Sequence, residues 1–151
     1  MAGLKVAAER CIGCFACEVA CMQEHELPPG PRLIRVEPAD KESLWTPGPM
    51  FRPVVCRHCG KATCIEACPE GALVRAENGT VAVVAEACTG CRACLEACPW
   101  AVPQFHPSSG IAMLCDLCSQ RTAAGGTTAC VHHCPANALE LTVPRERSRG
   151  D

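Results

Sequence analysis

Short apolar stretches, separated by glycine, proline and polar residues, predict strands of only a few residues each. Such strands are expected at 4–7, 32–36, 111–114 and 140–143. Between 74 and 83, two β-favouring segments flank the pair Asn78-Gly79, which is typical of a hairpin with a two-residue turn. This hairpin would deliver the chain to Cys88.

A helix is predicted from residue 17 onward, because the composition there favours helix formation. On this helix, Cys21 would follow Cys17 by one turn and lie on the same side. Seven prolines exclude a long helix between 27 and 55: Pro28, Pro29, Pro31, Pro38, Pro47, Pro49 and Pro53. The longest apolar run, 81–85, is far too short to span a bilayer.

Composition indicates that ordinary hydrophobic burial does not stabilise this chain by itself. The 151 residues include three Phe, two Trp and no Tyr, whereas 16 are Cys. A cysteine content of about 11% is in the range where cross-links or metals replace a core. Something covalent or inorganic is therefore expected to stabilise the fold.

Metal binding is favoured over disulfides, because the N-terminal sequence lacks the basic and apolar regions of a secretion signal and has no twin-arginine pair. Clustered cysteines in a chain without an export signal are typical of metal sites, and a cytoplasmic location is expected. The net charge of −2 and the pI near 6.2 give no basic stripe for nucleic acid.

All 16 cysteines fall into four runs of four. The third run, Cys88 to Pro99, has the C-x2-C-x2-C-x3-C-P spacing with which a bacterial-type ferredoxin loop binds a [4Fe-4S] cluster and sends its fourth thiolate to a neighbouring cluster. The first run lacks the proline, and the second has four residues between its second and third cysteines. The fourth has a long gap after Cys118, whose composition predicts a flexible loop. Zinc sites use paired C-x2-C units and need no such triplet, so iron-sulfur clusters are predicted. Four ligands per cluster give four [4Fe-4S] clusters.

Catalytic residues are not expected, because no cysteine remains free and neither a dinucleotide-binding nor a phosphate-binding glycine loop occurs. Histidines and cations within the runs could hydrogen-bond cluster sulfurs, face solvent or serve docking. For the histidines we favour the solvent-facing arrangement. These residues are His58, His132, His133, Arg57, Lys61 and Arg92.

The runs resemble those of the four-cluster ferredoxin-like electron-transfer subunits of molybdenum and tungsten oxidoreductases. Members serve dimethyl sulfoxide reductase, formate dehydrogenase, formate hydrogenlyase and tungsten aldehyde oxidoreductase. The resemblance is carried by Cys11 to Gly30, the wide loop from Cys56 to Pro69, Cys88 to Pro99, and Cys115 to Cys118 with its gap to Cys130. The long insertions and C-terminal membrane helix of larger relatives are not seen in this sequence.

The resemblance implies that run one pairs with run four and run two with run three, and that the last cysteine of each run crosses to its partner. It predicts four ligand sets, each named here by its first run member. The Cys11 set is Cys11, Cys14, Cys17 and Cys134; the Cys56 set is Cys56, Cys59, Cys64 and Cys98; the Cys88 set is Cys88, Cys91, Cys94 and Cys68; the Cys115 set is Cys115, Cys118, Cys130 and Cys21.

The predicted fold is α+β, with two pseudo-symmetric dicluster ferredoxin-like modules whose core is formed by the clusters. The inner module is 56–105, the outer module combines 1–55 with 106–143, and 144–151 is expected to be a disordered tail.

The predicted function is electron transfer between a molybdenum- or tungsten-pterin catalytic subunit, including the aldehyde oxidoreductase type, and a further redox carrier. A free polyferredoxin, a self-associating wire and a zinc-bound structural module are the alternatives. Docking is expected at 27–51 and at Gly125-Gly126, although Leu44, Trp45, Met50 and Phe51 could equally cap the clusters against water.

Overall fold

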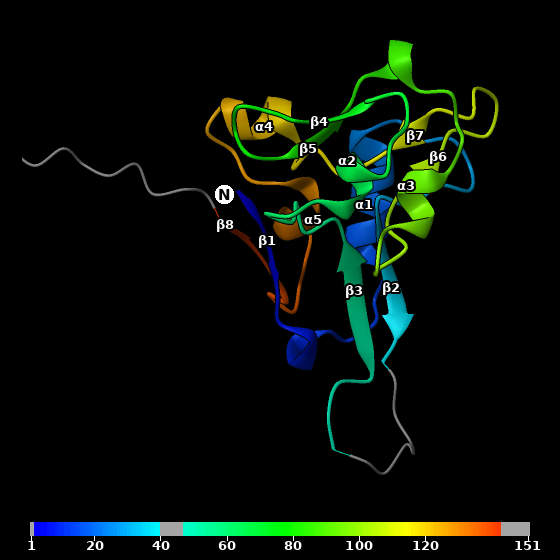
Figure 1. Ribbon diagram of the computed structural model, residues 1–151. Coiled ribbons are helices and arrows are strands. Elements are labelled where there is room, and N and C mark those ends of the chain that lie inside the picture. Colours follow the sequence, from blue (N-terminus) through cyan, green and yellow to red (C-terminus); the bar gives the residue numbers. More distant parts are fainter. Residues whose placement is uncertain (1, 40–46, 143–151) are drawn as a thin grey trace, which may run out of the picture.

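A computed structural model describes residues 2–39 and 47–142 (Figure 1). Its helices and 3-10 turns are η1 (Ala8–Arg10), α1 (Ala16–Glu24), α2 (Thr63–Glu66), η2 (Ala85–Ala87), α3 (Ala93–Glu96), α4 (Ser119–Ala123) and α5 (Ala129–His132). Its strands are β1 (Gly3–Val6), β2 (Ile34–Pro38), β3 (Phe51–Val55), β4 (Leu73–Arg75), β5 (Val81–Val83), β6 (Gln104–Phe105), β7 (Ala112–Met113) and β8 (Leu139–Thr142). The mixture of short helices and strands agrees with the predicted α+β class.

Strands from the two ends of the described chain form one sheet. β1 and β8 pair antiparallel, with Leu4 opposite Leu141 and Val6 opposite Leu139, and they lie side by side in Figure 1. Both strands are found within one residue of where the apolar pattern predicts them. This pairing brings the first and fourth cysteine runs to the same part of the molecule.

The second sheet contains a strand that the sequence pattern did not reveal. β2 was expected near 32–36, but its partner β3 includes Pro53, which cannot donate to a ladder and made the segment resemble a loop. Pro53 lies opposite Val36, and the backbone N–H of Ala39 donates to the carbonyl of Met50 at 2.9 Å. The two-stranded sheet tolerates the proline because only one edge of β3 is paired.

The predicted hairpin around Asn78-Gly79 is present as β4 and β5, but its turn is longer than two residues. The N–H of Ala76 donates to Thr80 O at 2.9 Å, which leaves 77–79 as the loop. The Asn78 side chain explains the difference, because its Oδ1 accepts from both the N–H of Thr80 (3.0 Å) and the Thr80 hydroxyl (2.7 Å).

A third hairpin, β6 with β7, lies where the sequence indicated turns followed by one strand. Its turn approaches the third cysteine run so closely that a Cβ on Gly90 would lie 2.7 Å from the carbonyl oxygen of Gly110. Glycine at 90 is therefore required by space as well as by its positive φ of 72°.

The helices that carry the third cysteine of each run pack in a nested order. α1 of the first run packs against α5 of the fourth run, and α2 of the second run packs against α3 of the third. The hydroxyl of Thr63 on α2 donates to the Ala97 carbonyl at the end of α3, at 2.8 Å.

The segment between Cys118 and Cys130, predicted to be flexible, instead contains α4. Asp116 explains the helix start, because its Oδ2 accepts from the N–H and the hydroxyl of Ser119, at 3.2 and 2.9 Å. The Arg121 Nε then donates to the Thr127 carbonyl at 3.0 Å and closes the loop.

Cysteines and small aliphatic residues make up the interior. The larger buried group includes Cys17, Ile34, Val55, Cys115 and Leu139, and the smaller one lies around Leu73, Val81 and Cys94. Within the described residues no aromatic side chain is among the buried hydrophobic ones. The interior thus consists of potential ligands together with aliphatic side chains.

In residues 2–39 and 47–142, no helix has the length and apolar character needed to cross a bilayer. The expected disordered tail at 144–151, together with Leu44 and Trp45, lies outside the described residues.

Candidate metal centres

The first three residues of each cysteine run share a backbone conformation. Two positions after the first cysteine the chain adopts a left-handed φ in every run, at Gly13 (69°), His58 (46°), Gly90 (72°) and Leu117 (58°). A non-glycine residue tolerates this region only at a cost, so its recurrence at His58 and Leu117 indicates a constraint imposed by the loop. Each of the four runs thus bends in the same way two positions after its first cysteine.

The Cys-Pro segments share a second turn. Three positions after Cys68, Cys98 and Cys134 the chain again has a left-handed φ, at Gly71 (60°), Ala101 (45°) and Asn137 (49°). After two of these turns the next backbone N–H points at the cysteine sulfur: Ala72 N to Cys68 Sγ at 3.3 Å and Ala138 N to Cys134 Sγ at 3.2 Å. Such donors stabilise a thiolate.

Three of the four expected ligand sets each line one cavity. The Cys11 set lies around a cavity walled by Ile12, Phe15, Val36, Pro53 and Leu139. The Cys56 set surrounds a second cavity with Ala62, Val81 and Leu114, and the Cys88 set surrounds a third with Leu73 and Phe105. In each cavity one cysteine comes from a different run than the other three.

The members of the Cys115 set also lie close to one another. Burial raises the pKa of Cys21 to about 12, and the charges of Cys130 and Cys118 raise it as well. Burial raises the pKa of Cys115 far above its ordinary value, and Cys130 and Cys21 add to the effect. Cys21 of the first run therefore shares its surroundings with three cysteines of the fourth run.

The donor chemistry of these places fits a thiolate-bound metal. Burial raises the pKa of Cys17 to about 12 and those of Cys56 and Cys94 to about 11, so these sulfurs are neutral thiols without a cation. Backbone donors nevertheless point at sulfur, from Ala112 N to Cys88 Sγ and from Ala129 N to Cys118 Sγ, both at 3.4 Å. Four sulfurs with amide donors around one small cavity suit a [4Fe-4S] cluster.

Arg75 on β4 holds the wide loop of the second run. Its guanidinium donates to the carbonyl oxygens of His58, Cys59 and Gly60, and also to that of Gly79 in its own hairpin. One side chain thereby fixes the loop that has two extra residues between Cys59 and Cys64. No local sequence signal marks this arginine, because its partners are backbone atoms 15 to 17 positions away.

His58 is buried, which makes the expectation of a solvent-facing side chain wrong. It is 1% exposed, and its Nδ1 accepts a hydrogen bond from Val81 N at 2.9 Å. Burial, followed by the charge of Arg75, lowers the pKa of His58 to about 4. His132 and His133, in contrast, are exposed as expected.

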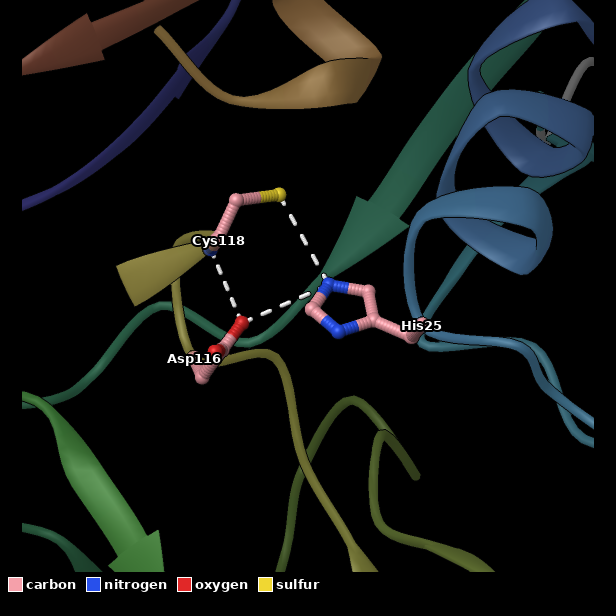
Figure 2. Close-up of side chains that lie close together, drawn as sticks. All are labelled: His25, Asp116 and Cys118. Carbon is pink, nitrogen blue, oxygen red and sulfur yellow. Dashed lines mark hydrogen bonds and ion pairs between the residues drawn. The ribbon is translucent and has the colours of Figure 1, made fainter. Parts of the chain in front are cut away.

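His25, Asp116 and Cys118 form a polar group beside the Cys115 set (Figure 2). The Nε2 of His25 lies 3.6 Å from Cys118 Sγ and 3.4 Å from Asp116 Oδ1, and the Cys118 N–H donates to the same Oδ1 at 2.8 Å. Burial opposes ionisation of Asp116, but bonds from Ser119 and Cys118 and the charge of His25 hold its pKa below the ordinary value. Because Cys118 is already an expected cluster ligand, this group is the surroundings of that site and not a separate one.

Two of the cations in the runs stack on aromatic rings. The Arg57 guanidinium lies 3.6 Å from the centre of the Trp100 ring, and the Arg92 guanidinium lies 5.1 Å from that of Phe105. The Trp100 carbonyl also accepts from Arg35 of β2 at 2.9 Å. These contacts tie the segment after Cys98 to its neighbours.

Phe51 covers the loop of the first run. A Cβ on Gly13 would lie 2.5 Å from the Phe51 ring, and the ring meets that of Phe15 edge to face, with centres 6.5 Å apart. Of the two roles expected for Phe51, shielding of the first run is the one its contacts display. Met50 beside it is 49% exposed.

Comparison with known proteins gives matches over most of the chain. The family described as 4Fe-4S dicluster domain matches residues 49–143. The thiosulfate reductase electron transfer subunit PhsB of Salmonella typhi is 41% identical over 137 residues, which cover 88% of this chain and 71% of the relative. The B subunit of the anaerobic dimethyl sulfoxide reductase of Escherichia coli strain K12 is 33% identical over 147 residues, covering 92% of this chain and 72% of the relative.

These matches agree with the cysteine runs, with the cavities that the cysteines line and with the resemblance drawn from the sequence. The chain belongs to the family of 4Fe-4S dicluster electron-transfer subunits that accompany molybdenum-containing reductases.

Proposed function

We propose that this protein is the electron-transfer subunit of an oxidoreductase complex and relays single electrons between a molybdenum- or tungsten-pterin catalytic subunit and a second redox carrier. The observation that carries the proposal is the grouping of cysteines from different runs around three separate cavities. Bound [4Fe-4S] clusters supply one-electron chemistry, and their potentials depend on hydrogen bonds to sulfur and on solvent exposure.

We assign the four ligand sets to four clusters, in an inner module of two and an outer module of two. The nested packing of α1 on α5 and of α2 on α3 supports this assignment, because each helix belongs to a run whose last cysteine is expected to cross to the partner run. The left-handed turns repeated in all four runs support pseudo-symmetry between the modules.

The mutual electrostatic influence of cysteines in different sets supports a linear order. The charge of Cys130 contributes to the raised pKa of Cys17, that of Cys56 to the raised pKa of Cys115, and that of Cys64 to the raised pKa of Cys94. The order is then the Cys11, Cys115, Cys56 and Cys88 sets. Electrons would enter at one end of this series and leave at the other.

The apolar end patch, defined as Ile12, Phe15, Val19 and Met50, is the proposed docking surface for the catalytic subunit. These side chains are 63%, 44%, 52% and 49% exposed, and Ile12 and Phe15 flank the exposed Cys14 of the terminal set. Apolar and Met side chains are enriched at the centre of protein interfaces, and the contact would bring a redox partner next to the end of the series.

The ligand assignment is tested by crossing variants on protein purified without oxygen. Cys98→Ser and Cys56→Ser should remove the same cluster signal from the EPR spectrum of the reduced protein, although 42 positions separate the two residues (98 − 56). Cys94→Ser is the matched control and should remove a different signal. If Cys98→Ser and Cys94→Ser remove the same signal, the crossing is wrong.

The partner is tested by copurification. Wild-type protein should bring down a pterin-containing subunit, and Val19→Glu and Met50→Glu should lose it while keeping the iron content of about 16 per chain expected for four cubanes. Val74→Glu is the control, because Val74 is also exposed but lies on β4 in the predicted inner module. Zinc in place of iron, or no pterin protein with the wild type, would reject the proposal.

A further inference from the structure

His58 has two ring nitrogens in very different situations. Nδ1 accepts from the N–H of Val81 at 2.9 Å, whereas Nε2 is buried and has no hydrogen-bond partner within the described parts of the chain. Buried polar atoms almost always have hydrogen-bond partners, because a buried donor or acceptor without one has lost its bonds to water and gained nothing in return. The orphaned Nε2 therefore indicates a partner that the polypeptide does not supply.

The tautomer of His58 follows from the Val81 contact. A backbone N–H can only donate, so Nδ1 must be the acceptor and carries no proton. In a neutral imidazole the proton is then on Nε2, and the orphaned atom is a hydrogen-bond donor. Its missing partner must be an acceptor.

The position of the ring narrows the choice of acceptor. The His58 Nδ1 lies 3.7 Å from Cys56 Sγ. The neighbours Arg57 and Cys59 line the cavity of the Cys56 set, but His58 itself does not. Val81 lines that cavity and also a second one lined by Cys115 and Asp116. Cys56 and Cys115 also belong to the same buried group. The ring thus lies between the Cys56 and Cys115 sets.

We infer that the Nε2–H of His58 donates a hydrogen bond to a sulfur of the cluster bound by the Cys115 set. The inference rests on the proposed function. His58 belongs to the loop of one set and would tune the neighbouring set, at the step that joins the outer and inner pairs. A hydrogen-bond donor to sulfur stabilises the reduced, more negative state of a cluster and raises its reduction potential.

Two variants separate this role from a purely structural one. His58→Asn retains an acceptor for Val81 N and suits the φ of 46°, since Asn tolerates left-handed backbone, but it lacks a donor at the Nε2 position. His58→Gln can place an amide N–H near that position. Cys115→Ser and Cys56→Ser identify which EPR signal belongs to which set.

The experiment is a potentiometric EPR titration of the holoprotein. His58→Asn should lower the midpoint potential of the Cys115-set cluster, with a threefold to tenfold change in its reduction equilibrium, where tenfold is about 59 mV for one electron. The other three potentials should not move, and His58→Gln should recover part of the change. Unchanged potentials in His58→Asn, or a change confined to the Cys56-set cluster, overturn the inference.

A second readout does not depend on that variant folding. Histidine labelled with nitrogen-15 should change the nitrogen hyperfine coupling of the reduced Cys115-set cluster in wild-type protein. His25 lies beside the same set, so the labelled His25→Phe variant should keep a histidine coupling if His58 is a source. Loss of all histidine coupling in that variant overturns the inference, whereas missing clusters in the wild type would instead reject the proposed function.

Discussion

Gly90 and Gly110 touch across two turns, and a Cβ on Gly90 would meet the carbonyl oxygen of Gly110 at 2.7 Å. The reverse is not true, because a Cβ on Gly110 has nothing within 4 Å. Both residues have nearly the same φ, 72° and 71°. The pair therefore separates backbone strain from steric exclusion.

Gly110→Ala should lower the free energy of unfolding by roughly 1–2 kcal/mol, which is the strain of an alanine in the left-handed region. Gly90→Ala should lower the free energy of unfolding by more, because the β6–β7 turn must also move away from the loop of the Cys88 set. The difference is measured as the denaturant midpoint of the visible absorbance of the clusters. Equal midpoints for the two variants would show that the β6–β7 turn can move without a loss of stability.

Removal of Arg75 should loosen the second run. Arg75→Ala loses the donors to His58, Cys59 and Gly60, and about 1–2 kcal/mol is expected after allowance for the solvent exposure of this side chain. Arg75→Lys keeps the charge but lacks the planar guanidinium with its several N–H donors, so it should restore less than half of the lost stability. The measurement is the rate at which a chelator removes iron. Full restoration by lysine would mean that the charge, and not the geometry of the guanidinium donors, stabilises the loop.

The Glu18 carboxylate accepts two hydrogen bonds, which join α1 to β2 and to Arg32 just before that strand. It is 12% exposed in its side chain, accepts from Val36 N at 2.6 Å and pairs with Arg32 Nε at 3.0 Å. Glu18→Ala should cost about 2–4 kcal/mol, because it leaves the buried Val36 N–H without an acceptor. Glu18→Gln keeps an acceptor and should cost about half as much. Thermal unfolding without oxygen distinguishes the two.

Acid should weaken the loop that Asp116 organises. Its pKa is held below the ordinary value, so its carboxylate contributes stability above about pH 4, and that stability is lost as the pH falls through the lower folded-state value. At pH 7, Asp116→Asn should lose cluster absorbance severalfold faster than wild type. The two rates should converge as the pH falls below the ordinary pKa of a carboxyl group. A constant ratio down to that pH would exclude the carboxylate as the cause.

Iron removal should unfold the protein. Raised thiol pKa values show that the buried cysteines provide no charge stabilisation among themselves, and the aliphatic core is small. Far-ultraviolet circular dichroism after anaerobic chelation should lose most of its structured signal. A native spectrum in the iron-free protein would mean that the aliphatic core suffices.

Much of the fold followed from local patterns. The ligand spacing, the Cys17 helix, β1, β8 and the 74–83 hairpin could be predicted, because each depends on residues close together in the chain. β3 and β6 could not, since Pro53 and the short length of β6 hide the alternation that marks a strand.

The surroundings of the ligands were harder to predict than the ligands. Spacing alone predicts the cysteines from Cys11 to Cys134 as ligands. The burial of His58 and the hydrogen bonds of Arg75 to the second run depend instead on contacts made after folding. His25 offered a weak signal, four residues after Cys21 at the end of the same helix. Asp116, two residues before Cys118, offered a helix-capping signal that the flexible composition of 119–129 concealed.

The pairing of β1 with β8 has a consequence for synthesis on the ribosome. Gly3 and Thr142 are neighbours in one sheet although 139 positions separate them, and Cys134 shares a cavity with Cys11, Cys14 and Cys17. Residues 56–98 contain all members of the two predicted inner sets, whereas Cys11, Cys14 and Cys17 cannot meet Cys134 until almost all of the described chain has been translated. The earliest cysteines to leave the ribosome are thus among the last to be enclosed, and during that interval they are the part of the nascent protein most open to oxygen.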